Sequence, residues 1–174
     1  MTAAAPLGPQ RREALRRRLL SLGLGELSAA TVFVLLAVSV IGPRWTDHQA
    51  ATLWWALGPL TVVLVQAGAY WLLARSWVGL GTMPRPVAQT YHVFRVLDPL
   101  LLALGLVMVL LRGGPDPGPW LLTLGVWAFA ALEYVNYFLV RLAYPPLAWA
   151  RAVTSWRTPR LVQDLRASAR DGRR

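Results

Sequence analysis

Six polar or charged residues lie within long apolar stretches of this sequence, where such side chains are costly. On insertion scales a central aspartate or arginine costs roughly 2.5–3.5 kcal/mol in a bilayer, so those that occur usually mark an ion pathway, a pairing or a binding site. Measured at 1.5 Å per residue from the same side of the expected helices, all lie at a depth of roughly 6–12 Å. They are Glu26, Gln66, Arg95, Asp98, Glu133 and Asn136.

The last apolar stretch has the most regular polar pattern. Its polar residues recur at offsets that place them on one helix face, which should point into a bundle. These residues are Glu133, Asn136, Tyr137 and Arg141. Glu133 and Arg141 are about 12 Å apart along a helix axis, so they do not pair directly. We therefore predict an ion pair between Glu133 and Arg95.

Three carboxyl groups, those of Glu26, Asp98 and Glu133, would then share Arg95 at similar depth. One interpretation is structural: these residues join the helices by hydrogen bonds and a buried ion pair, in a non-enzymatic accessory or partner-binding membrane component. The alternative is a small proton- or cation-coupled transporter, in which Glu133 acts with Asp98 or Glu26. The sequence leaves both open.

Covalent catalysis has little support in the sequence. There is no cysteine, which excludes thiolate nucleophiles and cysteine metal sites, and no nucleotide-binding, zinc-protease or serine-hydrolase motif occurs. The two histidines, His48 and His92, flank opposite sides of the expected spans and do not suit one metal. No cofactor or metal is expected. A weaker alternative, a lipid-modifying enzyme, would depend on Tyr91, His92, Arg95 and Asp98.

Residues 132–138 read Leu-Glu-Tyr-Val-Asn-Tyr-Phe. This stretch resembles the Glu-Tyr-(Ile/Val)-Asn-Tyr signature in the last helix of small uncharacterised bacterial four-helix integral membrane proteins. Those proteins often have glutamine where this chain has Arg141. The resemblance covers one helix. It implies a four-helix bundle and a bacterial source, and it supplies no reaction.

Four apolar stretches must position these side chains. Each has about 20 residues, enough for a helix to cross a hydrocarbon core of about 30 Å. With 56% hydrophobic residues and a mean hydropathy of +0.44, the chain is predicted to be an all-α, polytopic membrane protein with a four-helix transmembrane bundle. Pro99 predicts a kink or break in the third helix. The stretches are Leu19–Ile41, Thr52–Ala74, Tyr91–Leu111 and Trp120–Val140.

The basic residues predict an orientation. All 18 are arginine. The loops after the first and third stretches, which lie on one side, contain only Arg44 and Arg112, whereas nearly all other arginines lie in the segments on the opposite side. Because cytoplasmic loops retain arginine near the ends of spans, we expect a bacterial inner-membrane protein with both termini in the cytoplasm. A signal sequence cleaved near residues 37–39 is the alternative for the first stretch.

Three segments follow: a basic cytoplasmic segment (1–18), the transmembrane domain (19–144) and a basic interfacial tail (145–174). In the tail, Leu161, Val162 and Leu165 share one face of a short amphipathic helix. Because the arginines flank spans, the expected partner is a bilayer with anionic lipids and not nucleic acid, together with a second copy or a membrane partner protein. Expected headgroup contacts are Arg16, Arg17, Arg18, Arg151, Arg157, Arg160, Trp149 and Trp156.

Overall fold

The computed structural model describes residues 8–79, 81–139 and 159–171. These residues form four helices that are long and apolar enough to cross a membrane, and one short helix. The predicted all-α, four-helix transmembrane fold is thereby confirmed. The helices are α1 (Pro9–Leu36), continued by a π-helical segment (Ala37–Ile41) and a 3-10 turn (Gly42–Arg44), α2 (Asp47–Trp77), α3 (Arg85–Leu111), α4 (Pro117–Phe138) and α6 (Arg160–Asp171).

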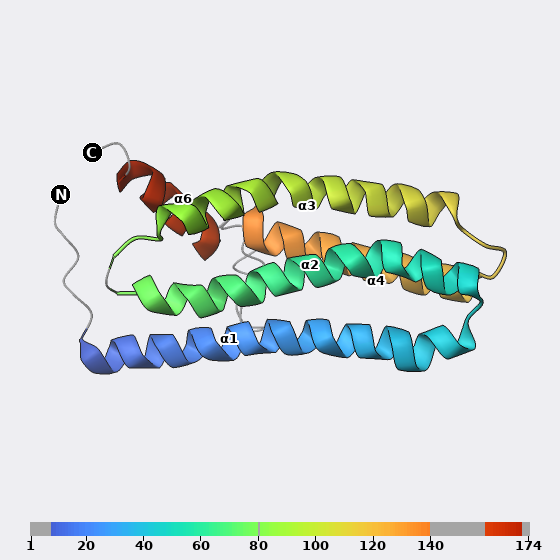
Figure 1. Cartoon of the computed structure of the whole chain (residues 1–174), viewed down its shortest axis with the longest axis horizontal. Coiled ribbons are helices and arrows are strands. Elements are labelled where there is room, and N and C mark those ends of the chain that lie inside the picture. Colours follow the sequence, from blue (N-terminus) through green and yellow to red (C-terminus); the bar gives the residue numbers. More distant parts are fainter. Residues whose placement is uncertain (1–7, 80, 140–158, 172–174) are drawn as a thin grey trace, which may run out of the picture.

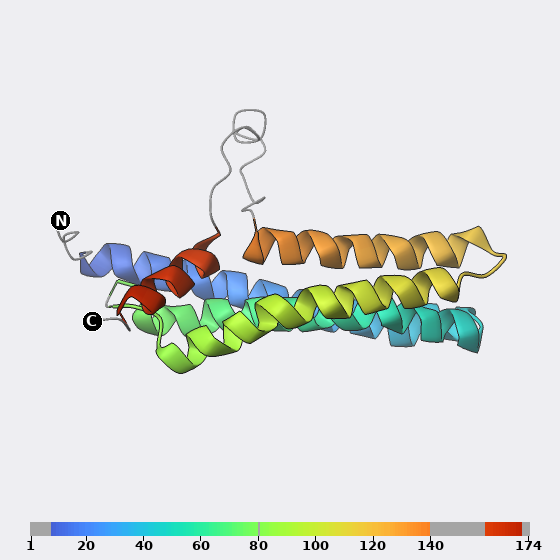
Figure 2. The same ribbon diagram turned by 90° about the horizontal axis from the view of Figure 1, so that it is seen from above.

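Successive long helices run in opposite directions, side by side (Figures 1 and 2). One end of the bundle contains the start of α1, the end of α2, the start of α3 and the short helix α6 (Figure 1). We call it the α6 end. At the opposite end, which we call the far end, short turns at residues 44–46 and 112–116 join α1 to α2 and α3 to α4. The bundle is therefore an up-and-down arrangement.

Local signals explain where the helices begin. Thr46 forms a capping box for α2: its hydroxyl accepts a hydrogen bond from the backbone N–H of Gln49 (3.3 Å), and its own N–H donates to the Gln49 side chain (3.0 Å). Asp116 accepts from the N–H of Gly118 (3.2 Å) at the start of α4. The predicted break at Pro99 is absent, because α3 continues to Leu111.

The central helix is α2, which packs against α1, α3 and α4. In the most apolar 18-residue stretch of α2, half of the residues are buried. The corresponding share is 11% in the first span and 22% in each of the other two. Small residues allow close approach: a Cβ added at Gly105 of α3 would lie 2.4 Å from the carbonyl oxygen of Trp55 on α2. The other helices leave large apolar side chains exposed, which suits contact with lipid.

The fourth spanning helix is short, and α6 lies beyond its end. α4 has 22 residues whereas α2 has 31, so α4 stops at Phe138 before the α6 end. α6 lies there, against α3 and α4 (Figure 1). Leu161, Val162 and Leu165, for which we predicted a shared face of a short helix, are all buried, and Leu161 and Leu165 pack in the cluster that contains Tyr70.

Candidate functional site: a polar network between the helices

Gln66 of α2 and Asp98 of α3 form the most deeply buried polar contact. The Gln66 side-chain amide donates to Asp98 Oδ1 over 3.0 Å, and Asp98 is only 1% exposed. The Tyr91 hydroxyl, seven residues before Asp98 and therefore on the same face of α3, donates to the backbone carbonyl of Gln66 (2.7 Å). Gln66 Oε1 and Asp98 Oδ2 have no hydrogen-bond partner within the described residues.

A second contact joins α1 to α4. The Tyr137 hydroxyl donates to Glu26 Oε1, and both side chains are at least partly buried. Glu133 lies one turn before Tyr137, close enough to Glu26 for the two carboxyl groups to interact electrostatically. The structure thus brings together Glu26, Glu133 and Tyr137, as their shared depth and helix face had suggested. Asn136 lies on the same stretch and is half-buried.

The predicted ion pair between Glu133 and Arg95 is wrong. The Arg95 side chain is exposed, and no ion pair joins these two residues within the described ranges. Tyr134 explains the difference, because its hydroxyl reaches α3 beside Arg95 and donates to that residue's backbone carbonyl (3.0 Å). At the depth of Arg95 a tyrosine thus makes the polar contact between α3 and α4, while the arginine extends outward, as long cationic side chains near a membrane surface commonly do.

Sequence reasoning missed a third contact, made by Asp164 of α6. Its Oδ2 atom accepts hydrogen bonds from the hydroxyl of Tyr70 (2.9 Å) and the indole N–H of Trp77 (3.2 Å). Tyr70 and Trp77 are seven residues apart and share one face of α2. The spacing of three residues between Leu161 and Asp164 was the available signal that Asp164 shares the apolar face of α6.

The residues proposed for a lipid-modifying enzyme are not brought together. Tyr91 and Asp98 are buried, whereas His92 and Arg95 are exposed, so the four do not share one surface. Within the described residues, no group of three or more His, Cys, Asp or Glu side chains could hold a metal ion.

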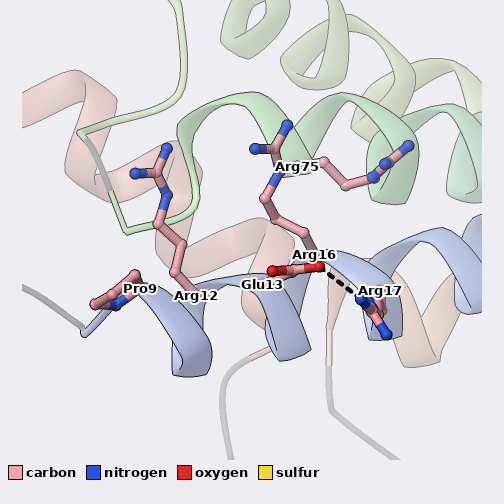
Figure 3. Close-up of a pocket in the computed structure, with 6 residues that line it drawn as sticks. All are labelled: Pro9, Arg12, Glu13, Arg16, Arg17 and Arg75. Atoms are coloured by element: carbon pink, nitrogen blue, oxygen red, sulfur yellow. Dashed lines mark hydrogen bonds and ion pairs between the residues drawn. The ribbon is translucent and has the colours of Figure 1, made fainter.

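A basic pocket of about 520 Å³ lies at the α6 end, between α1 and α2. It contains two of the predicted headgroup-binding residues, Arg16 and Arg17 (Figure 3). Arg18 is exposed outside it, and Arg160 is half-buried. The pocket is lined by Pro9, Arg12, Glu13, Arg16, Arg17 and Arg75. Five other predicted residues lie outside the described ranges: Arg141, Trp149, Arg151, Trp156 and Arg157.

Comparison of the chain with models of known protein families, with characterised proteins and with solved structures finds no match. The function is therefore inferred from the polar network between the helices and from the basic pocket between α1 and α2.

Proposed function

We propose that the chain is a non-enzymatic integral membrane component with an accessory or partner-binding role. The observation that carries this proposal is the use of its intramembrane polar groups as links between helices. Gln66 bonds to Asp98, Tyr137 to Glu26 and Tyr134 to the α3 backbone. Polar groups engaged in this way stabilise the association of helices. The resemblance of residues 132–138 to bacterial four-helix membrane proteins supports the bundle and a bacterial source.

The proposed location is the bacterial inner membrane, with the α6 end in the cytoplasm. Arg11, Arg12, Arg16, Arg17, Arg18, Arg75 and Arg85 lie toward that end, whereas the far end has Arg44 and Arg112. This asymmetry supports the orientation. Single cysteines at the exposed positions Gln10 and Pro84 should resist impermeant thiol reagents in intact cells, and cysteines at Asp47 and Asp116 should react. Ser168 is an unsuitable probe position because it is buried. Labelling of Gln10 or Pro84 from outside would reverse the orientation.

A partner would contact the apolar surface that the bundle leaves open. α1 offers such a surface, because its strongest contacts are with α2 and Leu35 is 57% exposed. A photo-crosslinking residue at Leu35 should give a discrete protein adduct in native membranes, identified by mass spectrometry as a second copy or one defined protein. The same residue at Ala30, which is 4% exposed, is the matched control. Exclusive crosslinking of Leu35 to lipid would contradict a partner on this face.

The transporter remains a second candidate, favoured by the unpartnered oxygens of Gln66 and Asp98. Two buried acceptors side by side suit a proton or a small cation. Proton and sodium uptake by proteoliposomes should discriminate between the two functions, with Asp98→Asn as the comparison. Under our proposal, wild type and Asp98→Asn show the same background flux. Flux that wild type supports and Asp98→Asn abolishes would establish transport instead.

A further inference from the structure

The basic pocket is built by the antiparallel packing of α1 on α2. Gly23 and Gly68 mark the close contact: a Cβ added at Gly23 would lie 3.0 Å from the Gly68 carbonyl oxygen. Arg16 lies seven residues before Gly23, and Arg75 lies seven residues after Gly68. Because the helices run in opposite directions, both arginines are two turns, about 10 Å, from the contact and on facing sides. Arg12 lies one turn beyond Arg16, on the same face.

This packing places like charges together. Figure 3 shows Arg12 and Arg16 extending from α1 toward the end of α2, which carries Arg75. Among the lining residues, Glu13 is the only acid, and its carboxylate is engaged by Arg17 over 2.6 Å. Arg12, Arg16 and Arg75 make no ion pair within the described residues. Like charges that line one pocket repel one another, and an anion bound among them would offset that repulsion.

Hydrogen bonding points to the same kind of ligand. Within the described residues, the guanidinium groups of Arg12 and Arg75 have no carboxylate partner. Both are donors only, so the complementary group is an oxygen acceptor carrying negative charge. Guanidinium groups match the oxygens of phosphate in geometry as well as in charge. The volume of about 520 Å³ is also within the roughly 300–1,000 Å³ typical of small-ligand pockets.

We propose that Arg12, Arg16 and Arg75 form a binding site for a phosphate group at the α6 end of the α1–α2 pair. The source of the phosphate is either the headgroup of an anionic phospholipid or a soluble phosphate. The lipid source rests on the membrane location proposed above, whereas phosphate recognition by these arginines does not. The site differs from a diffuse basic surface because its residues come from two helices and line one pocket.

The test uses the full-length protein in nanodiscs of neutral phosphatidylcholine. In one arm, phosphatidic acid replaces part of the lipid; in the other, inorganic phosphate is added at constant ionic strength. Thermal unfolding is followed by tryptophan fluorescence, and binding is taken from the concentration dependence of Tm. Arg75→Gln should weaken binding at least tenfold, corresponding to about 1.4 kcal/mol. Arg11→Gln removes the same charge from an exposed position of the same helix outside the pocket and should change binding less than twofold.

A second readout separates a binding site from a fold defect. Without added anion, Arg75→Gln should raise Tm, because it relieves repulsion from Arg12 and Arg16. With anion present, its Tm should fall below that of wild type. Stabilisation by phosphatidic acid alone identifies a lipid headgroup, by inorganic phosphate alone a soluble ligand, and by both a site for the phosphate group itself. Equal effects of Arg75→Gln and Arg11→Gln, or no saturable stabilisation in either arm, would overturn the proposal. Neither of those results would bear on the accessory role proposed for the bundle.

Discussion

The two halves of the bundle satisfy their polar side chains in different ways. Near the far end, threonine hydroxyls donate to carbonyls of their own helix, four residues earlier: Thr52 to His48 (2.7 Å) and Thr123 to Pro119 (2.9 Å). Near the α6 end, polar side chains reach across to other helices, as the bond from Gln66 to Asp98 illustrates. The far half makes few such contacts; one example is the bond from Arg112 Nε to the Thr52 hydroxyl (3.3 Å).

This difference indicates what holds each half together. Local threonine bonds leave the association of helices in the far half to close packing, which Gly105 permits. In the other half, hydrogen bonds select which helix faces meet. Single interhelical hydrogen bonds in membranes average about 0.6 kcal/mol, with a maximum of about 1.7 kcal/mol. A steric change in the far half should therefore have a larger effect than the loss of one hydrogen bond near α6.

The largest effect is expected from Gly105→Ala. The new Cβ would lie 2.4 Å from the Trp55 carbonyl oxygen, and a backbone atom moves only if the helix moves. We expect destabilisation near the upper end of the about 1–3 kcal/mol typical of overpacking, measured as a lower Tm in detergent. Gly125→Ala is the control, because its Cβ would meet nothing within 4 Å. If the two variants had equal Tm, the close packing of α2 and α3 would be refuted.

The next effect tests whether hydrogen bonds hold α6 on the bundle. Asp164→Ala removes the acceptor for Tyr70 and Trp77. We expect a loss of about 1.5 kcal/mol, the lower end for hydrogen bonds to a charged group, since Asp164 is half-exposed. Hydrogen exchange of residues 160–171 should accelerate while that of α2 stays unchanged. Arg166→Ala, at an exposed position of the same helix, should leave the exchange unaltered. Unchanged exchange in Asp164→Ala would show that Leu161 and Leu165 alone anchor α6.

A smaller effect is expected at the buried pair on α2 and α3. Gln66→Leu and Asp98→Leu should each lower stability by about 0.6 kcal/mol, the average for an interhelical hydrogen bond in a membrane, because each removes one partner of the bond. The double variant should be more stable than the sum of the single losses implies. Thermal unfolding of the four proteins gives the coupling energy. Strict additivity would mean that the bond contributes nothing to the packing of these helices.

The smallest effect is expected at Arg95. Because its side chain is exposed and makes no ion pair within the described residues, Arg95→Ala should change stability by less than about 0.5 kcal/mol. In the double variant with Glu133→Ala, the two changes in the free energy of unfolding should add. Tyr134→Phe supplies the contrast, since it removes the hydroxyl that bonds to the α3 backbone. Measurable coupling between Arg95 and Glu133 would restore the ion pair that the sequence suggested.

The sequence alone determined the number of spans and the half of the bundle in which polar groups gather. Both are local properties: a run of apolar residues predicts a spanning helix wherever it occurs, and the depth of Glu26, Gln66 or Asp98 follows from counting along that helix. The shared face of Glu133 and Tyr137 is equally local, because it depends only on helical periodicity. These predictions needed no knowledge of how the helices pack.

Tertiary structure alone decided which polar groups meet. Depth restricts partners to one layer, but the rotation of each helix about its axis selects among them. That rotation follows from how the helices pack, and in α4 it directs Tyr134 rather than Glu133 to α3 beside Arg95. Asp164 lies 94 residues from Tyr70 in sequence, and it bonds there because α4 ends early and leaves room for α6. Helix rotation and the docking of a distant segment are properties of the assembled bundle, and no local pattern encodes them.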